Sequence, residues 1–326
     1  MHQRATVGAA ALLVAGILAG CSSPDAASHA AKDTTPIDRS TWPAQTAESG
    51  LAKGLRLPLA AYTPTYGDQV EVNTALGTLQ ARCMAEYGFT VDLPSSAVTP
   101  PPTNDTNIER RYGITDRAQA RKHGYLLPPE QRGTTLETDL DLPAVQVEVL
   151  TGHTKPAQAA APEEGDGSYV GATGATESAR AEVNGKKLRS GGCIGWSKRQ
   201  LKTDDFYTGL ITQLASKSLS DSRLAKPVEN AVKEWSACMK GKGRKVPDPY
   251  RAIEQGLADV KGDDPTRNAI ELALDDIDCK KQTRLVRVWF TEESTVQRRL
   301  IEENKSRLDD VKKRSDEVIE AARSVK

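Results

Sequence analysis

The C-terminal part of the chain contains no glycine or proline after Pro265, up to the last residue, Lys326. Because these two residues most readily end a helix, the run predicts a long amphipathic helix over about 265–325. Two packed helices with a break near Thr291–Ser294 are the alternative. Near its end, seam positions alternate by three and four residues, which is coiled-coil spacing, although two of them are polar. The seam is Ile301, Asn304, Leu308, Val311, Ser315, Val318, Ala322 and Val325.

Helical spacing also covers much of the preceding chain. Asp68–Gly88 predicts a helix with Asp68 as its N-terminal cap and Gly88 as its left-handed stop. Thr115–Gly124 predicts a short helix capped by Thr115 and ended by Gly124. Ala144–Leu150 is ambiguous, because its valines alternate as in a strand but the run is short and isolated. The predicted fold class is mainly α: a disulfide-stapled helical domain with little or no β-sheet.

Several stretches lack the large apolar side chains that a packed core needs. Residues 22–50 are rich in Ala, Ser, Thr, Asp and Pro, so we expect 21–55 to be a flexible tether. Disordered loops are predicted at about 94–107, which holds several prolines, and at about 151–190. The remaining chain, 56–326, is expected to form one helical domain with a modest core, since only 38% of all residues are apolar and 5% aromatic.

The N-terminus has the pattern of an export signal. Arg4 supplies a positive charge, and Ala10–Leu18 is apolar but too short to span a bilayer as a stable helix. The stretch that closes this run, Leu18-Ala19-Gly20-Cys21, resembles the lipobox of bacterial lipoproteins. That resemblance implies that residues 1–20 are a signal peptide and that Cys21 carries a diacylglyceryl anchor on the outer face of the membrane. An ordinary secretory signal with an accidental cysteine is the alternative.

The overall charge balance argues against nucleic acid or anionic lipid as a partner, although the basic run at 240–245 leaves contact with an anionic wall polymer open as a less favoured alternative. Removing residues 1–20 takes away only Arg4, so 44 basic residues become 43 against 44 acidic ones. A net charge near minus one gives no electrostatic basis for binding nucleic acid. The expected membrane contact is therefore the lipid at Cys21.

Four cysteines remain outside the lipobox, which in an exported chain favours two disulfides. Cys83-Met84 and Cys238-Met239 each lie near the end of an amphipathic helix, with a glycine five residues after the cysteine. Each is followed by a later cysteine, Cys193 or Cys279. This faint internal repeat favours the pairs Cys83–Cys193 and Cys238–Cys279. The chief alternative is Cys83–Cys238 with Cys193–Cys279.

Three short elements support a wider resemblance. They are Arg111–Tyr125, Gly191-Gly192-Cys193 and Trp235–Met239. They resemble a group of secreted lipoproteins of high-GC Gram-positive, actinobacterial bacteria to which no chemistry is assigned. The resemblance implies a location in the envelope of such a cell and transfers no functional residue.

No catalytic, cofactor or metal site is predicted. His123 and His153 stand alone, and the cysteines have no zinc-site or CxxC spacing. No P-loop, dinucleotide fingerprint or Gly-x-Ser-x-Gly elbow is present. The charged clusters are interpreted as solvated surface: Asp275, Asp276 and Asp278 on one helix face, and Lys240, Lys242, Arg244 and Lys245 at a turn.

The sequence therefore predicts a lipid-anchored, extracytoplasmic protein that acts as a non-enzymatic interaction or accessory protein of the cell envelope. An enzyme acting on cell-wall polymers is one alternative, and a solute-binding lipoprotein of a transporter is another. For the apolar seam of the C-terminal helix, the alternative to binding a partner is packing against the chain's own helices. The predicted partner surface, for an envelope protein or a second copy, is Ile301, Asn304, Leu308, Val311, Val318 and Val325.

Overall fold

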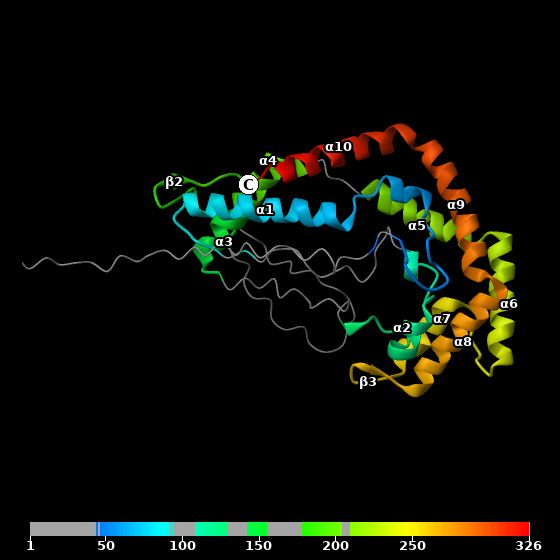
Figure 1. Cartoon of the computed structure of the whole chain (residues 1–326). Helices are drawn as coiled ribbons and strands as arrows, with labels where there is room; N and C mark the ends of the chain where they lie inside the picture. The colour runs from blue at the N-terminus through cyan, green and yellow to red at the C-terminus, as the bar shows by residue number, and fades with distance from the viewer. Residues whose placement is uncertain are drawn as a thin grey trace, which may run out of the picture. The chain divides into compact units, whose positions relative to one another are not determined.

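The computed structural model describes Ala44, Leu93 and residues 46–91, 108–129, 142–154, 178–203 and 209–325. Over these residues the chain is mainly α-helical, as predicted (Figure 1). The helices are α1 (Tyr66–Glu86), α2 (Arg117–His123), α3 (Ala144–Thr151), α4 (Gly192–Leu201), α5 (Gly209–Arg223), α6 (Lys226–Gly241), α7 (Pro249–Ala258), α8 (Arg267–Thr283), α9 (Leu285–Glu303) and α10 (Lys305–Ser324), with 3-10 turns η2 (Pro58–Ala61) and η3 (Ile108–Arg110).

Two antiparallel hairpins are the only sheets within the described ranges. In one, β1 (Glu182–Val183) pairs with β2 (Lys186–Lys187), and in the other, β3 (Val260–Lys261) pairs with β4 (Asp264–Pro265). The prediction of a disordered loop at about 151–190 is therefore wrong for its last part, because residues 178–190 form the first hairpin and its flanks. Its turn residue Asn184 donates a 2.7 Å hydrogen bond to the Tyr87 carbonyl, which fastens the hairpin to the end of α1. The loop at 94–107 and residues 155–177 lie outside the described residues.

Two predicted helix caps are wrong by a few residues. Thr65, not Asp68, is the N-cap of α1; Asp68 at the third position bonds back to the Thr65 backbone, completing a capping box. Asp116 caps α2 by accepting from two backbone N–H groups, whereas the Thr115 hydroxyl donates to the Glu109 carbonyl. The predicted stop at Gly124 is confirmed, and so is the left-handed Gly88, with φ +82°.

The ambiguous segment at 144–150 forms helix α3. Its apolar side chains contact α4 and α1, and Gly152 ends it in the left-handed conformation with φ +77°. The valine alternation therefore does not reflect a strand. In this short helix Val149 and Leu150 are buried and Val145 half-buried, so the apolar residues serve a helical contact instead.

The predicted single helix over 265–325 is divided into three. Arg284 adopts a left-handed conformation with φ +53° between α8 and α9, and Asn304 leaves helical geometry with φ −121° between α9 and α10. Neither break coincides with the predicted one at Thr291–Ser294, which lies inside α9. Each bend lets the following helix pack against a different neighbour: α9 contacts α5 and α6, and α10 contacts α1 (Figure 1).

The last part of the predicted tether belongs to the folded body. Ala47, Ala52 and Leu55 are buried in the largest apolar core. The backbone N–H of Leu51 donates to the Thr115 carbonyl at 3.1 Å, so the segment is held by the loop before α2. Residues 21–43 and Gln45 of the predicted tether lie outside the described residues.

Both favoured disulfides are present. Cys83–Cys193 joins α1 to α4, and Cys238–Cys279 joins α6 to α8. The first lies in an apolar cluster of α1, α3, α4 and β1, and the second in the largest core, which also holds Trp235 and Trp289.

Gly192→Ala is expected to destabilise the protein by about 2–4 kcal/mol. Gly192 has φ +61°, and a Cβ there would lie 2.5 Å from the Gly152 nitrogen and 2.6 Å from the Leu150 carbonyl oxygen. Chemical denaturation measures the loss. The matched control is Gly185→Ala, where φ is +73° but no atom lies within 4 Å of the added Cβ. Equal losses at both positions would show that the steric contact between the added Cβ and the backbone at the end of α3 contributes nothing to the loss of stability.

Candidate functional site

The predicted partner surface on the C-terminal helix is packed within the chain itself. Leu308 and Val311 lie in a cluster with Leu59, and Val318 lies in another with side chains of α1. Leu308 is 0%, Val311 4% and Val318 1% exposed. The remaining members, Ile301, Asn304 and Val325, are half-buried. The described seam therefore presents no continuous apolar stripe to an external partner, because α1, α5 and η2 cover it.

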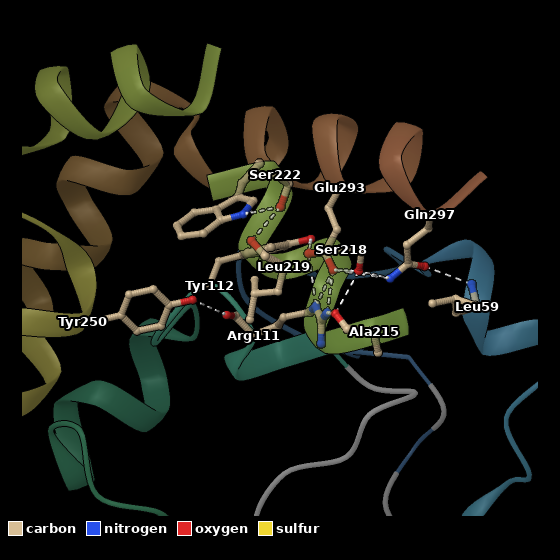
Figure 2. Close-up of polar contacts among 11 residues, drawn as sticks. Leu59, Arg111, Tyr112, Ala215, Ser218, Leu219, Ser222, Tyr250, Glu293 and Gln297 are labelled. Atoms are coloured by element: carbon tan, nitrogen blue, oxygen red, sulfur yellow. Dashed lines mark hydrogen bonds and ion pairs between the residues drawn. The ribbon is translucent and has the colours of Figure 1, made fainter. Parts of the chain in front are cut away.

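A fully buried carboxylate, Glu293 of α9, organises a polar network between α5, α9 and the segment after η3 (Figure 2). Arg111 Nε donates to Glu293 Oε1 at 2.9 Å, and the Tyr112 hydroxyl donates to Oε2 at 2.9 Å. Ser218 lies 2.8 Å from Oε1, and Gln297 extends the network to the Leu59 backbone N–H. Burial, with the neighbouring Glu293, raises the pKa of the Tyr112 hydroxyl.

A second buried carboxylate, Asp276 of α8, has a similar set of partners. Lys280 Nζ lies 3.0 Å from Asp276 Oδ2, the Tyr125 hydroxyl donates to the same oxygen at 3.0 Å, and Trp235 Nε1 donates to Oδ1 at 2.9 Å. Lys280 also donates to the Ile114 carbonyl at 2.9 Å. Burial raises the pKa of Asp276 and lowers that of Lys280, and each partner opposes the effect on the other.

The buried Asp276 corrects the interpretation of the acidic cluster as a solvated face. Asp276 and Lys280 are one turn apart, on the same side of α8 as the buried Ala273 and Ala269. The sequence contained a signal for this pair, because Asp276 and Lys280 share helical spacing with the small apolar residues Ala269 and Ala273. Asp275 and Asp278 are half-buried, with 22% and 40% of their side chains exposed, so only these two of the three aspartates reach the surface.

The basic turn after α6 pairs with that outward acidic face. Lys242 Nζ lies 3.2 Å from Asp275 Oδ1, and Arg244 Nε lies 3.0 Å from Asp275 Oδ2. Arg117 of α2 pairs with Asp278. Much of the positive charge predicted for this turn is thus balanced within the chain.

Neither buried carboxylate has the surroundings of an acid–base catalyst. All four of their oxygens accept hydrogen bonds from protein groups, and neither residue lines the hollow described below. A buried ion pair with its hydrogen bonds satisfied is an arrangement that holds elements together. His123 is half-buried and His153 exposed, and the described residues contain no group of three or more potential metal ligands.

A hollow of about 330 Å³ lies beside the turn between α5 and α6. Its apolar lining includes Val232, Pro247, Tyr250 and the almost fully buried Trp289. Tyr250 meets Trp289 edge to face with ring centroids 5.9 Å apart, and its hydroxyl lies 3.4 Å from the Arg111 carbonyl oxygen. Tyr250 of the lining is thereby connected through Arg111 to the Glu293 network (Figure 2).

The rim of this hollow combines an exposed apolar side chain with charges of both signs. Leu224 is 74% exposed, the most exposed large apolar residue in the described structure. Arg223 lies over the Tyr250 ring at 5.1 Å and 3.6 Å from Asp248. Glu229 and Lys233 of α6 complete the rim. Sequence analysis missed this site, since its residues come from α5, the turn after it, α6, the residues that lead into α7, the start of α7, and α9.

Cys21, the predicted lipidation site, lies outside the described residues. Among the described helices, none is both long and apolar enough to cross a bilayer. Comparison of the chain with protein-family models, with curated proteins and with solved structures gives no match.

Proposed function

We propose that the chain is a lipid-anchored protein of the outer face of the cell membrane and acts as a non-enzymatic interaction or accessory protein of the envelope. The anchor rests on the lipobox ending at Cys21. The interaction role rests on one observation, the hollow beside the exposed Leu224. A large apolar side chain next to an aromatic-lined hollow is the kind of surface that protein partners use.

The two alternative functions have less support. An enzyme acting on wall polymers needs a carboxylate that can reach its substrate, whereas the oxygens of Asp276 and Glu293 are occupied by protein donors. A solute-binding lipoprotein needs a cleft that encloses its ligand, and a hollow of about 330 Å³ is at the small end of that class.

Cys21→Ser is expected to release the protein from the membrane fraction into the medium, because the substitution removes the sulfur that carries the lipid. Immunoblotting of membrane and culture supernatant from the same cells measures the distribution. The matched control is Ser22→Ala, which keeps the thiol and leaves the protein in the membrane fraction. Retention of Cys21→Ser at the wild-type level would contradict the anchor.

The interaction role is tested by photo-crosslinking in intact cells. The reactive amino acid is placed at Leu224 or Lys233 on the hollow, and at the exposed Lys281 of α8, which does not line it, as a control. We expect protein adducts from the first two positions and none from the third. The absence of adducts from both hollow positions, in cells that carry the anchored protein, would overturn the role.

A further inference from the structure

The two disulfides differ in how close their sulfur atoms lie to solvent. Cys83 and Cys193 are both 0% exposed, whereas in the other bond only Cys279 is 0% exposed and Cys238 is half-buried. We propose that the Cys238 sulfur is a thiol-exchange site, at which a small external thiol opens the Cys238–Cys279 bond of the folded protein. This inference goes beyond the proposed interaction function and does not depend on the hollow.

Access to the bond is limited to one of its sulfur atoms. A thiolate must reach a sulfur to displace its partner, so access decides which of the two is attacked. Gln282 Oε1 lies 3.5 Å from Cys238 Sγ in a solvent-exposed contact, so this sulfur meets a polar side chain at the surface. Cys279 lies among the buried residues of the largest core, which shield its sulfur from the same reagent. Attack is therefore directed to Cys238, and Cys279 is the sulfur that leaves.

The Cys83–Cys193 bond is enclosed by a cluster of buried apolar residues, Met84, Tyr87, Val149, Leu150 and Val183. A reagent reaches this bond only when the cluster opens, and a cluster that opens about 1% of the time slows attack about 100-fold. Cys193 lies in the first turn of α4, where a helix N-terminus stabilises a departing thiolate. That effect is worth about 5-fold at most, so access decides the order in which the two bonds are reduced.

The exchange balances in two steps. The thiolate of the reagent bonds to Cys238 Sγ, the Cys238–Cys279 bond breaks, and the Cys279 thiolate takes a proton from water. A second thiolate then attacks the reagent sulfur of the mixed disulfide, which releases the oxidised reagent and leaves two protein thiols. The protein bond gains two electrons and the reagent loses them. The oxidised reagent closes the bond again by the reverse steps.

The contact between α6 and α8 has other support besides the bond. Trp235 Nε1 of α6 donates to Asp276 Oδ1 of α8 at 2.9 Å, and both residues are 0% exposed. At the surface, Lys242 Nζ lies 3.2 Å from Asp275 Oδ1 near the same end of α6. Opening the bond therefore leaves a helical protein with two thiols, and the exchange is reversible.

Reduction by glutathione at about pH 8 tests the order, on the chain that begins at Ser22 and so lacks the lipobox cysteine. Samples are quenched with excess maleimide in denaturant and digested with trypsin, which separates the four cysteines. We expect the Cys238–Cys279 bond to be reduced at least about 10-fold faster than the Cys83–Cys193 bond. Peptide mass spectrometry should find the glutathione adduct on Cys238 and the maleimide on Cys279.

Two further measurements separate access from the intrinsic reactivity of the sulfurs. In a denaturing concentration of urea, both bonds should be reduced within about 3-fold of each other. In native buffer, the helical circular dichroism signal should persist after the first bond opens. The proposal would be overturned by faster or equal reduction of the Cys83–Cys193 bond in native buffer, by resistance of both bonds, or by an adduct on Cys279. Loss of the helical signal with the first reduction, or the same preference in urea, would also overturn it.

A charge placed beside the sulfur tests the route of attack. Gln282→Glu should slow the first reduction about 3-fold and Gln282→Lys should speed it about 3-fold, because the attacking thiolate is negative. The matched controls are Gln213→Glu and Gln213→Lys, at an exposed position of α5, and these should leave the rate unchanged. Equal rates in the wild type and both Gln282 variants would rule out attack at the Cys238 sulfur.

Discussion

Lys280→Met is expected to destabilise the protein by about 3–5 kcal/mol, since it leaves the Asp276 carboxylate buried without its cation. Both side chains are 0% exposed, and the Ile114 carbonyl also loses its donor. A loss of this size is a large part of the 5–15 kcal/mol that typically stabilises a domain. Urea denaturation at pH 7, followed by circular dichroism, measures the loss.

The pH dependence of this variant identifies the cause. Burial already raises the pKa of Asp276, and removal of the ammonium raises it further. A carboxyl with a raised folded-state pKa is tolerated when it is protonated, so the stability deficit should shrink as the pH falls from 7 toward about 4. Lys281→Met, at the exposed neighbour, should change stability by less than about 0.5 kcal/mol at either pH. A deficit in Lys280→Met that does not depend on pH would indicate lost packing instead.

Replacing Cys83 and Cys193 by alanine is expected to cost about 4–5 kcal/mol. The bond closes a loop with a sequence separation of 110 residues, and its loss returns that conformational freedom to the unfolded chain. It also frees α4 from α1 in a small apolar cluster. Guanidinium denaturation of the double variant under oxidising conditions measures the change.

The other disulfide is the internal comparison. Cys238–Cys279 closes a separation of only 41 residues, so its alanine double variant should lose about 1 kcal/mol less. It also lies against a larger core, which retains more contacts when the bond is absent. A greater loss from the 238–279 variant would mean that native packing around the bond, and not loop closure, controls its contribution.

The networks around the two buried carboxylates hold one segment, residues 111–114, against helices α8 and α9. Arg111 reaches Glu293 of α9, and the carbonyl of Ile114 accepts from Lys280 of α8. Residues 111–114 are thereby fastened to two consecutive helices by charged groups, of which Glu293 and Lys280 are fully buried. Gly113, with φ +81°, is needed there, because a Cβ would lie 2.6 Å from Lys280 Nζ. A buried charge that loses its partner is strongly destabilising, so these contacts restrict how residues 111–114 can pack.

Local pattern was sufficient for the helical class and for the disulfide pairing. The spacing that predicts α1 and α6 depends on residues one turn apart, and the repeated Cys-Met at the ends of these helices pointed to the correct pairs. The ends of helices were less predictable. Thr65 competes with Asp68 for the cap of α1, and only backbone geometry distinguishes them. The bends at Arg284 and Asn304 carry no Gly or Pro signal, because they arise where neighbouring helices redirect the chain.

The amino-acid sequence alone was enough to predict the helical class and to favour the two cysteine pairs that form, because both rest on local spacing or a short repeated motif. The lipid anchor at Cys21 rests on the sequence motif alone and stays a prediction. Tertiary structure decided which faces are covered. The seam containing Leu308 and Val318 has the same spacing whether it meets a partner or α1, and only the packing buries it. The tertiary structure likewise brings Arg111 next to Glu293, 182 residues later in the chain, and assembles the hollow beside Leu224. Burial is a property of segments that meet in space, so local periodicity cannot specify it.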